Sequence, residues 1–134
     1  MTGRRVLGIG LDPHTIDFNS DFYRSKPLNA DVIAGGIKAD EARILGMGHD
    51  FEWLLINARG GAKAASAAAR ARLAARPVDV VVVGGGVRLD SAQTPVLEAL
   101  VNAVIDAAPG ARMAFNTSPT DTAEAVGRVS DIEP

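Results

Sequence analysis

Hydrophobic residues along the chain follow two patterns, short unbroken apolar runs and longer stretches of helical periodicity. Short runs bounded by Gly or Pro are typical of strands, whereas apolar positions recurring every three to four residues are typical of helices. The run VDVVVV at 78–83 is the clearest strand, because β-branched residues without alternation are expected where both faces are covered. The pattern predicts strands at 4–11, 51–57, 78–83 and 111–115, and helices at 30–45, 62–75, 95–108 and from Pro119 to about 128.

Capping residues place several of these boundaries. Asn29 precedes the first helix, and Thr94 followed by Pro95 precedes the third. Asn, Thr and Ser are favoured as N-caps, and Pro is favoured at the first helical position. Ser118 followed by Pro119 repeats the device, so Ser118 is predicted to cap the last helix.

The regular alternation of strand and helix predicts the fold class. It favours a parallel sheet with helices on both faces, and right-handed crossovers leave few arrangements. We predict one α/β domain over residues 1–134, a three-layer Rossmann-like or flavodoxin-like domain with strand order 2-1-3-4. In such sheets ligands bind beyond the carboxyl ends of the strands, where the order reverses. Here that position lies between the first and third strands.

Composition narrows the classes of protein. No apolar run approaches the roughly 18–20 residues that span a membrane, and the apolar stretch after the basic N-terminus is too short for a signal peptide. Cysteine is absent, which excludes disulfides and thiolate chemistry. A net charge of −2, scattered basic residues and 4% aromatic residues argue against nucleic-acid binding. We expect a cytoplasmic protein that binds neither membrane nor nucleic acid.

The Gly-rich turn after the third strand is the strongest candidate for a ligand site. Gly84, Gly85 and Gly86 tolerate positive φ and would leave backbone N–H groups open to an anion. Arg88 adds a planar set of donors suited to carboxylate or phosphate. The alternative is a tight structural turn in which Arg88 pairs with a neighbouring aspartate.

The other strand ends supply further candidates. Asn116, Thr117 and Ser118 follow the fourth strand, where Asn116 could orient a ligand and the next helix offers unpaired N–H groups. Asp12 and His14 follow the first strand and are the candidate catalytic residues, for proton transfer. Both could equally be idle loop residues. Asp12, His14 and Asp17 are not expected to form a metal site, because all three lie on one loop and no further ligand is evident elsewhere in the sequence. Arg59, after the second strand, is expected to be solvated.

The sequence contains no complete motif for binding a common cofactor. GIGLDP at 8–13 begins like a dinucleotide fingerprint, but Pro13 occupies the third glycine position and the following loop is too long. There is no P-loop and no Gly-x-Ser-x-Gly nucleophile elbow. We therefore predict no cofactor and no metal.

Two short motifs, VVVVGGGVR at 80–88 and FNTSP at 115–119, carry a resemblance. The chain resembles a family of small α/β proteins that have a strand–Gly-x-Gly-x-Arg turn and a later Phe-Asn-Thr-x-Pro turn, over about residues 6–128. The resemblance implies the four-stranded fold and no particular activity. It points to the same two turns, including Pro119.

The functional expectation is a small enzyme or a binding protein for a small anionic metabolite, a carboxylate or a phosphate, held at the carboxyl edge of the sheet. Whether the chain is an enzyme stays open, since no motif defines a reaction. The alternative is a non-catalytic interaction protein that forms a homodimer, with a purely structural glycine turn. A four-stranded sheet has two exposed edges, which favours such association.

Overall fold

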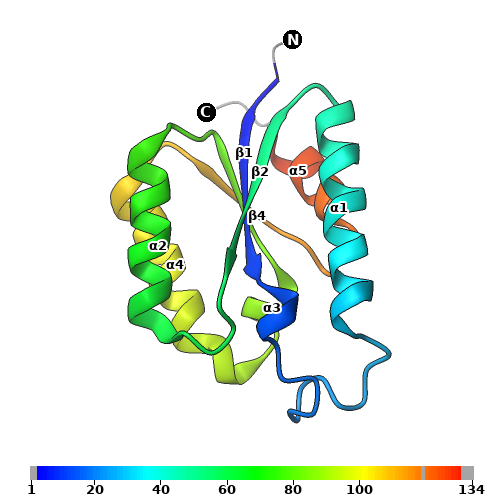
Figure 1. Cartoon of the computed structure of the whole chain (residues 1–134). Coiled ribbons are helices and arrows are strands. Elements are labelled where there is room, and N and C mark those ends of the chain that lie inside the picture. The colour runs from blue at the N-terminus through cyan, green and yellow to red at the C-terminus, as the bar shows by residue number, and fades with distance from the viewer. Residues whose placement is uncertain (1–2, 119, 131–134) are drawn as a thin grey trace.

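The computed structural model describes residues 3–118 and 120–130 and contains one parallel sheet of four strands. The strands are β1 (Arg5–Leu11), β2 (Asp50–Ile56), β3 (Val80–Val83) and β4 (Arg112–Phe115). They lie in the order β2-β1-β3-β4, and every neighbouring pair is parallel (Figure 1). The predicted α/β fold class and strand order are confirmed.

Helices cover both faces of this sheet. One face carries α1 (Ala30–Gly46) and α5 (Thr122–Ser130), and the other carries α2 (Gly61–Ala75) and α4 (Thr94–Ala107), which gives three layers (Figure 1). Three shorter elements lie at the carboxyl ends of the strands. They are the one-turn helix α3 (Gly85–Arg88) and the 3-10 turns η1 (Pro13–Thr15) and η2 (Ser91–Gln93). None of these three was predicted from the sequence.

The valines of β3 form the centre of the core. All four are at most 2% exposed, as the unbroken run predicted. Val81 and Val83 pack beneath α2 and α4 with Leu7 and Ile9 of β1, while Val80 and Val82 belong to the cluster that includes α5. Because both faces of β3 are buried, residues that follow it emerge in the middle of the carboxyl edge.

β3 ends beside Ile9 of β1, two residues before β1 itself ends at Leu11. Ile9 pairs with Val83, and the backbone N–H of Gly84 donates to the Ile9 carbonyl at 2.9 Å. Gly10 and Gly84 therefore lie side by side at the point where the strand order reverses. This is the position at which open α/β sheets hold ligands.

Helix boundaries match the predicted caps only in part. Asn29 caps α1, accepting a hydrogen bond from the Val32 N–H at 2.9 Å, as expected. Thr94 is the first residue of α4 and Gln93 occupies the cap position. The expectation that Ser118 caps the last helix is wrong, since α5 begins at Thr122; Pro119 lies outside the described residues. Within the described part of the chain, no helix is both long and apolar enough to cross a bilayer.

Candidate functional site

A cavity of about 190 Å³ opens at the carboxyl edge of the sheet, between the ends of β1 and β3 and the N-terminal half of α1. Its walls are mainly apolar, with one side-chain amide, four hydroxyls and one amine among them. The described lining residues are Gly10, Leu11, Ile16, Phe22, Tyr23, Lys26, Leu28, Ile33, Ile37, Trp53, Gly84, Gly85, Gly86, Leu89, Asn116, Thr117, Ser118 and Thr122. The two predicted turns and the segment between η1 and α1 thus share one hollow.

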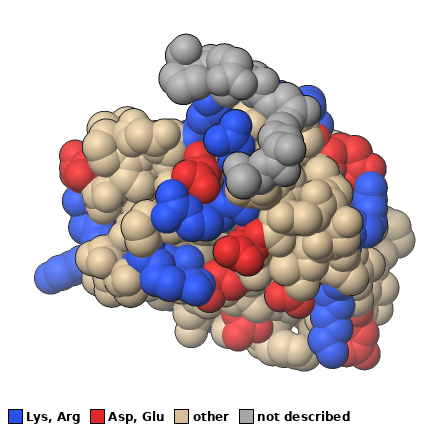
Figure 2. All heavy atoms as spheres, turned by 90° about the horizontal axis from the view of Figure 1, so that it is seen from above, with Lys and Arg blue, Asp and Glu red and all other residues tan. Residues whose placement is uncertain are grey.

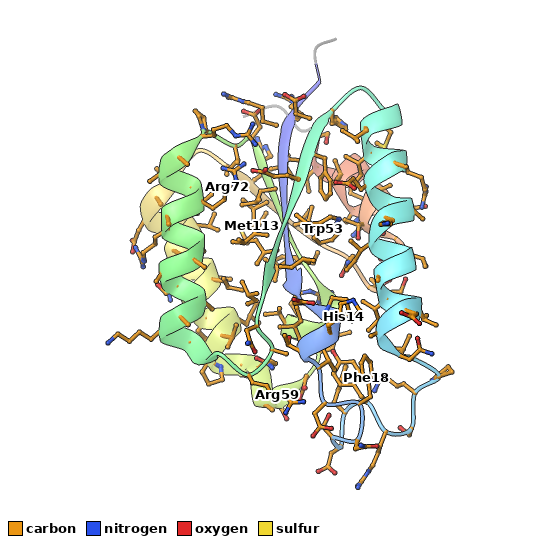
Figure 3. All side chains as sticks on the ribbon, in the orientation of Figure 1. His14, Phe18, Trp53, Arg59, Arg72 and Met113 are labelled. Atoms are coloured by element: carbon orange, nitrogen blue, oxygen red, sulfur yellow. The ribbon has the colours of Figure 1, made fainter. Side chains whose placement is uncertain are left out.

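Two glycines of β1 make room on the face of the sheet toward α1. A Cβ on Gly8 would lie 2.6 Å from the Trp53 ring, so the absence of a side chain there admits the indole. A Cβ on Gly10 would lie 3.6 Å from the same ring, an ordinary contact, and Gly10 remains open to the cavity. Figure 3 shows Trp53 between the sheet and α1. Trp53 therefore forms one end of the cavity.

The glycine turn after β3 serves close packing within the chain. A Cβ on Gly86 would lie 2.8 Å from the Tyr23 hydroxyl and 3.3 Å from Leu11 Cδ1. Gly84, Gly85 and Gly86 do not adopt the positive φ that glycine tolerates. Among the described glycines only Gly48 and Gly61 have positive φ, and residues 85–88 form a regular helical turn. The group that approaches Gly86 most closely is the Tyr23 hydroxyl of the same molecule.

Tyr23 is nearly enclosed by its surroundings. It is 5% exposed, and its ring meets Phe18 and Phe22 edge-on at centroid distances of 5.4 and 4.8 Å. Burial, reinforced by the negative charge of Asp90, raises the pKa of the Tyr23 phenol to about 12. The phenol is therefore protonated at neutral pH and is a poor general base.

Asn116 is the polar group that bears most directly on function. It is 4% exposed and lines the cavity, and its Nδ2 donates to Thr122 Oγ1 at 3.0 Å. Its Oδ1 is buried and has no hydrogen-bond partner in the described structure. Leaving a buried acceptor unpaired costs about 1–3 kcal/mol, so such atoms call for an explanation. Trp53 Nε1, in the cavity wall, is likewise buried and unpaired.

Arg88 lies beside the cavity and is not one of its described lining residues. Its Nη2 donates to the Asn116 carbonyl, and its guanidinium carbon lies 5.2 Å from the centre of the Phe115 ring. Arg88 thus joins the glycine turn to the turn after β4. It holds the Asn116 backbone in place, and a contact between Arg88 and an anion stays a prediction.

The N–H groups after β4 are bonded within the chain. The backbone N–H groups of Thr117 and Ser118 donate to the carboxylate of Asp121 at 2.9 and 3.0 Å, and the Thr117 hydroxyl donates to it as well. Burial acts to raise the pKa of Asp121, but these hydrogen bonds outweigh burial and hold that pKa below its ordinary value. Asp121 therefore occupies the position that the sequence suggested for a ligand anion.

Asp12 and His14 lie at the same edge of the sheet but not in the cavity wall. The Asp12 carboxylate accepts the His14 backbone N–H at 3.0 Å and caps η1, and His14 is exposed. A catalytic role for this pair stays a prediction. Arg59, expected to be solvated, is exposed, although its Nε donates to the Thr15 carbonyl at 2.9 Å.

The opposite end of the sheet carries interleaved positive and negative side chains (Figure 2). Arg5 pairs with Asp79 at 3.0 Å, and Arg72 and Arg76 both pair with Glu52. The hydrogen bond from Arg76, with further help from Arg72, lowers the pKa of Glu52 despite partial burial. Because these charges are paired with one another, this end presents a weaker candidate site than the cavity.

The lining residues that were not predicted from the sequence include Trp53, Tyr23, Lys26 and two isoleucines of α1, Ile33 and Ile37. A signal was present in β1, where Gly8 and Gly10 alternate on one face of a buried strand and leave space for large neighbours. By contrast, the predicted residues Gly84–Gly86 and Asn116–Ser118 do line the cavity.

Fold and cavity together define a doubly wound α/β domain with a small, mainly apolar hollow at its topological switch point. The chain matches no protein-family model, and no curated protein matches its sequence. The resemblance to small α/β proteins with the same two turns therefore stays a prediction.

Proposed function

We propose that the protein binds a small, mainly apolar organic molecule carrying at least one N–H or O–H group, held in the cavity at the carboxyl edge of the sheet. One observation carries the proposal: Asn116 lines the 190 Å³ cavity, and its Oδ1 is buried without a hydrogen-bond partner among the described residues. A ligand donor at that oxygen would supply the missing partner. Leu11, Ile33 and Trp53 are among the apolar residues that would surround the rest of the ligand.

The sequence predicted an anionic ligand, whereas this proposal requires no negative charge on the ligand. Asp121 already accepts the N–H groups that a phosphate would need, and Arg88 donates to the Asn116 carbonyl. Among the described lining residues Lys26 is the single cationic side chain. A carboxylate on the ligand would face Lys26 at the exposed rim of the cavity, so we retain a carboxylate as an optional group.

Binding is favoured over catalysis by the chemistry of the walls. The described lining residues include no Asp, Glu or His, and the Tyr23 phenol is protonated at neutral pH. The Thr117 hydroxyl donates to the Asp121 carboxylate, which lies outside the lining, and the described lining residues provide no carboxylate or imidazole to activate the hydroxyls of Ser118 and Thr122. We therefore assign the cavity a binding role.

The test uses two probes of equal size, phenol and toluene, which differ in a hydroxyl against a methyl group. Binding is followed by the NMR signal of the Trp53 indole N–H, which is unambiguous because the chain has one tryptophan. Asn116→Leu removes the acceptor at similar volume. It should weaken phenol binding about tenfold or more and leave toluene binding unchanged or stronger, because only phenol uses the oxygen.

Thr122→Val is the matched control, since it breaks the same side-chain hydrogen bond but leaves Asn116 Oδ1 in the cavity. It should keep more of the phenol affinity than Asn116→Leu, because the acceptor oxygen remains although the hydrogen bond that orients the Asn116 amide is lost. Absence of a Trp53 shift with both probes up to about 10 mM would refute a binding cavity. Equal losses of phenol and toluene in Asn116→Leu would refute the role of Asn116.

One observation supports the alternative prediction of a homodimer. The sheet ends on β2 and β4, whose outer edges pair with no strand in the described part of the chain, and Leu55 of β2 is 39% exposed. Open edges of this kind can join two copies. As a second proposal, a dimer should appear in sedimentation equilibrium at micromolar concentration, and a strictly monomeric protein would exclude it.

A further inference from the structure

The floor of the cavity is formed by main chain without side chains. Gly10 of β1 and Gly84 after β3 lie next to each other, and a Cβ on Gly84 would lie 3.7 Å from Gly10 Cα. Both residues line the cavity, so a ligand at this place meets peptide groups directly. Glycine permits this close approach to the backbone, which any larger residue would block.

The remaining walls make this floor one side of a slot. Ile33 and Ile37 of α1 line the cavity, and the Trp53 ring stands at the end, 3.6 Å from the position of a Gly10 Cβ. Phe22 and Tyr23 add two further aromatic rings to the lining. Aromatic side chains favour ring ligands through stacked and edge-on contacts. A flat group can lie on the peptide plane of the floor at van der Waals distance, whereas the axial hydrogens of a puckered ring hold it further away.

The volume limits the size of the part of the ligand that the cavity encloses. An apolar cavity of about 150 Å³ accommodates benzene. At about 190 Å³ this cavity has room for one six-membered ring with one or two small substituents. It is too small to enclose a dinucleotide.

The unpaired polar atoms specify what the ring carries. Asn116 Oδ1 requires a donor, and its position is held by the bond from Nδ2 to Thr122. Trp53, another lining residue, has a buried Nε1 without a described partner, which is a donor for an acceptor atom on the ligand. We infer that the ligand is a single planar ring, aromatic or heteroaromatic, with an N–H or O–H group at its edge that donates to Asn116. This inference rests on the proposed binding function and specifies its ligand class.

Comparison of phenol with cyclohexanol tests planarity, because the two have the same ring size and a single hydroxyl. Phenol should bind about tenfold or more tightly, as followed by the Trp53 indole signal. Equal affinities would overturn the planar ring while leaving the proposed binding function intact. Absence of binding by both alcohols would overturn the proposed function and this inference with it.

A variant of the floor tests where the ring lies. In Gly10→Ala the new methyl meets only ordinary contacts, Trp53 at 3.6 Å and Leu55 at 4.0 Å, so the fold should persist. The methyl nevertheless occupies the floor and should lower phenol affinity about tenfold or more. Gly35→Ala is the control, because its Cβ would meet nothing within 4 Å on an exposed part of α1. Unchanged phenol affinity in Gly10→Ala, with an unchanged melting temperature, would overturn the slot.

Discussion

The contact between Gly86 and Tyr23 allows a direct test of why the chain has glycine after β3. In Gly86→Ala the new Cβ would lie 2.8 Å from the Tyr23 hydroxyl and 3.3 Å from Leu11 Cδ1. Real Cβ atoms essentially never approach another atom to 2.8 Å, so Tyr23 must move. Because Tyr23 is only 5% exposed and its ring packs edge-on against Phe18 and Phe22, a shift of Tyr23 disturbs buried contacts.

The expected magnitude follows from two opposing effects. Overfilling a packed core costs about 1–3 kcal/mol, while alanine in place of glycine in a helical turn regains up to about 1 kcal/mol. The net loss in the free energy of unfolding for Gly86→Ala should be about 1–2 kcal/mol. Tyr23→Phe alone should change little, since the hydroxyl makes no hydrogen bond to any described residue.

The double variant separates the clash from other causes. Removing the Tyr23 hydroxyl should relieve Gly86→Ala almost completely, because the hydroxyl is the atom in closest contact. Urea denaturation of the four proteins should therefore give a coupling energy of about 1–2 kcal/mol. Additive losses would refute the steric account, and so would an undiminished stability in Gly86→Ala. Gly35→Ala combined with Tyr23→Phe is the control pair and should be additive.

Three further outcomes are expected. Burial raises the pKa of Tyr23 to about 12, above its unfolded value of about 10, so the stability that this group contributes below pH 10 should be lost between about pH 10 and 12. Tyr23→Phe should lack this loss in alkaline denaturation, and phenolate absorbance reports Tyr23 alone, as the chain has one tyrosine. Asp121→Ala should lower the free energy of unfolding by about 1–2 kcal/mol at neutral pH, as measured by urea denaturation. Because the pKa of Asp121 is lowered in the folded chain, the difference in stability between variant and natural chain should shrink as the pH falls below about 4. Arg88→Ala should lower the free energy of unfolding by about 1–3 kcal/mol, and with it the melting temperature, because the hydrogen bond to the Asn116 carbonyl is lost. An unchanged melting temperature together with weaker binding of acetate would instead show that Arg88 contacts a ligand.

Six residues that line the cavity were predictable from the sequence, but the hydrogen bonds that the nearby donors make were not. The predicted strand order, with the rule that ligands bind where this order reverses, indicated residues 84–86 and 116–118, and all of them line the cavity. An anion was expected from donors that are common in anion sites, an arginine and a helix start. In the structure Asp121 and the Asn116 carbonyl accept from those donors. The hydrogen-bonding capacity of a residue is readable from its type, but whether that capacity is already used depends on its neighbours.

The architecture itself was determined by the sequence, because the signals for it are local. A run such as Val80–Val83 needs cover on both faces wherever it occurs, and Asn29 caps α1 through a partner three residues away. Handedness and short connections then leave few ways to arrange four parallel strands. None of these steps requires knowing which distant residues touch.

Only the tertiary structure decided what fills the space above each glycine. Gly8 faces Trp53, 45 residues later, and Gly86 faces Tyr23, 63 residues earlier. Glycine in a sequence indicates that space is required, but it does not say whether a ligand or the chain itself occupies that space. The answer depends on packing between elements, where the size and direction of both side chains act together. The same packing leaves Gly10 uncovered and Asn116 Oδ1 unpaired, and so creates the cavity.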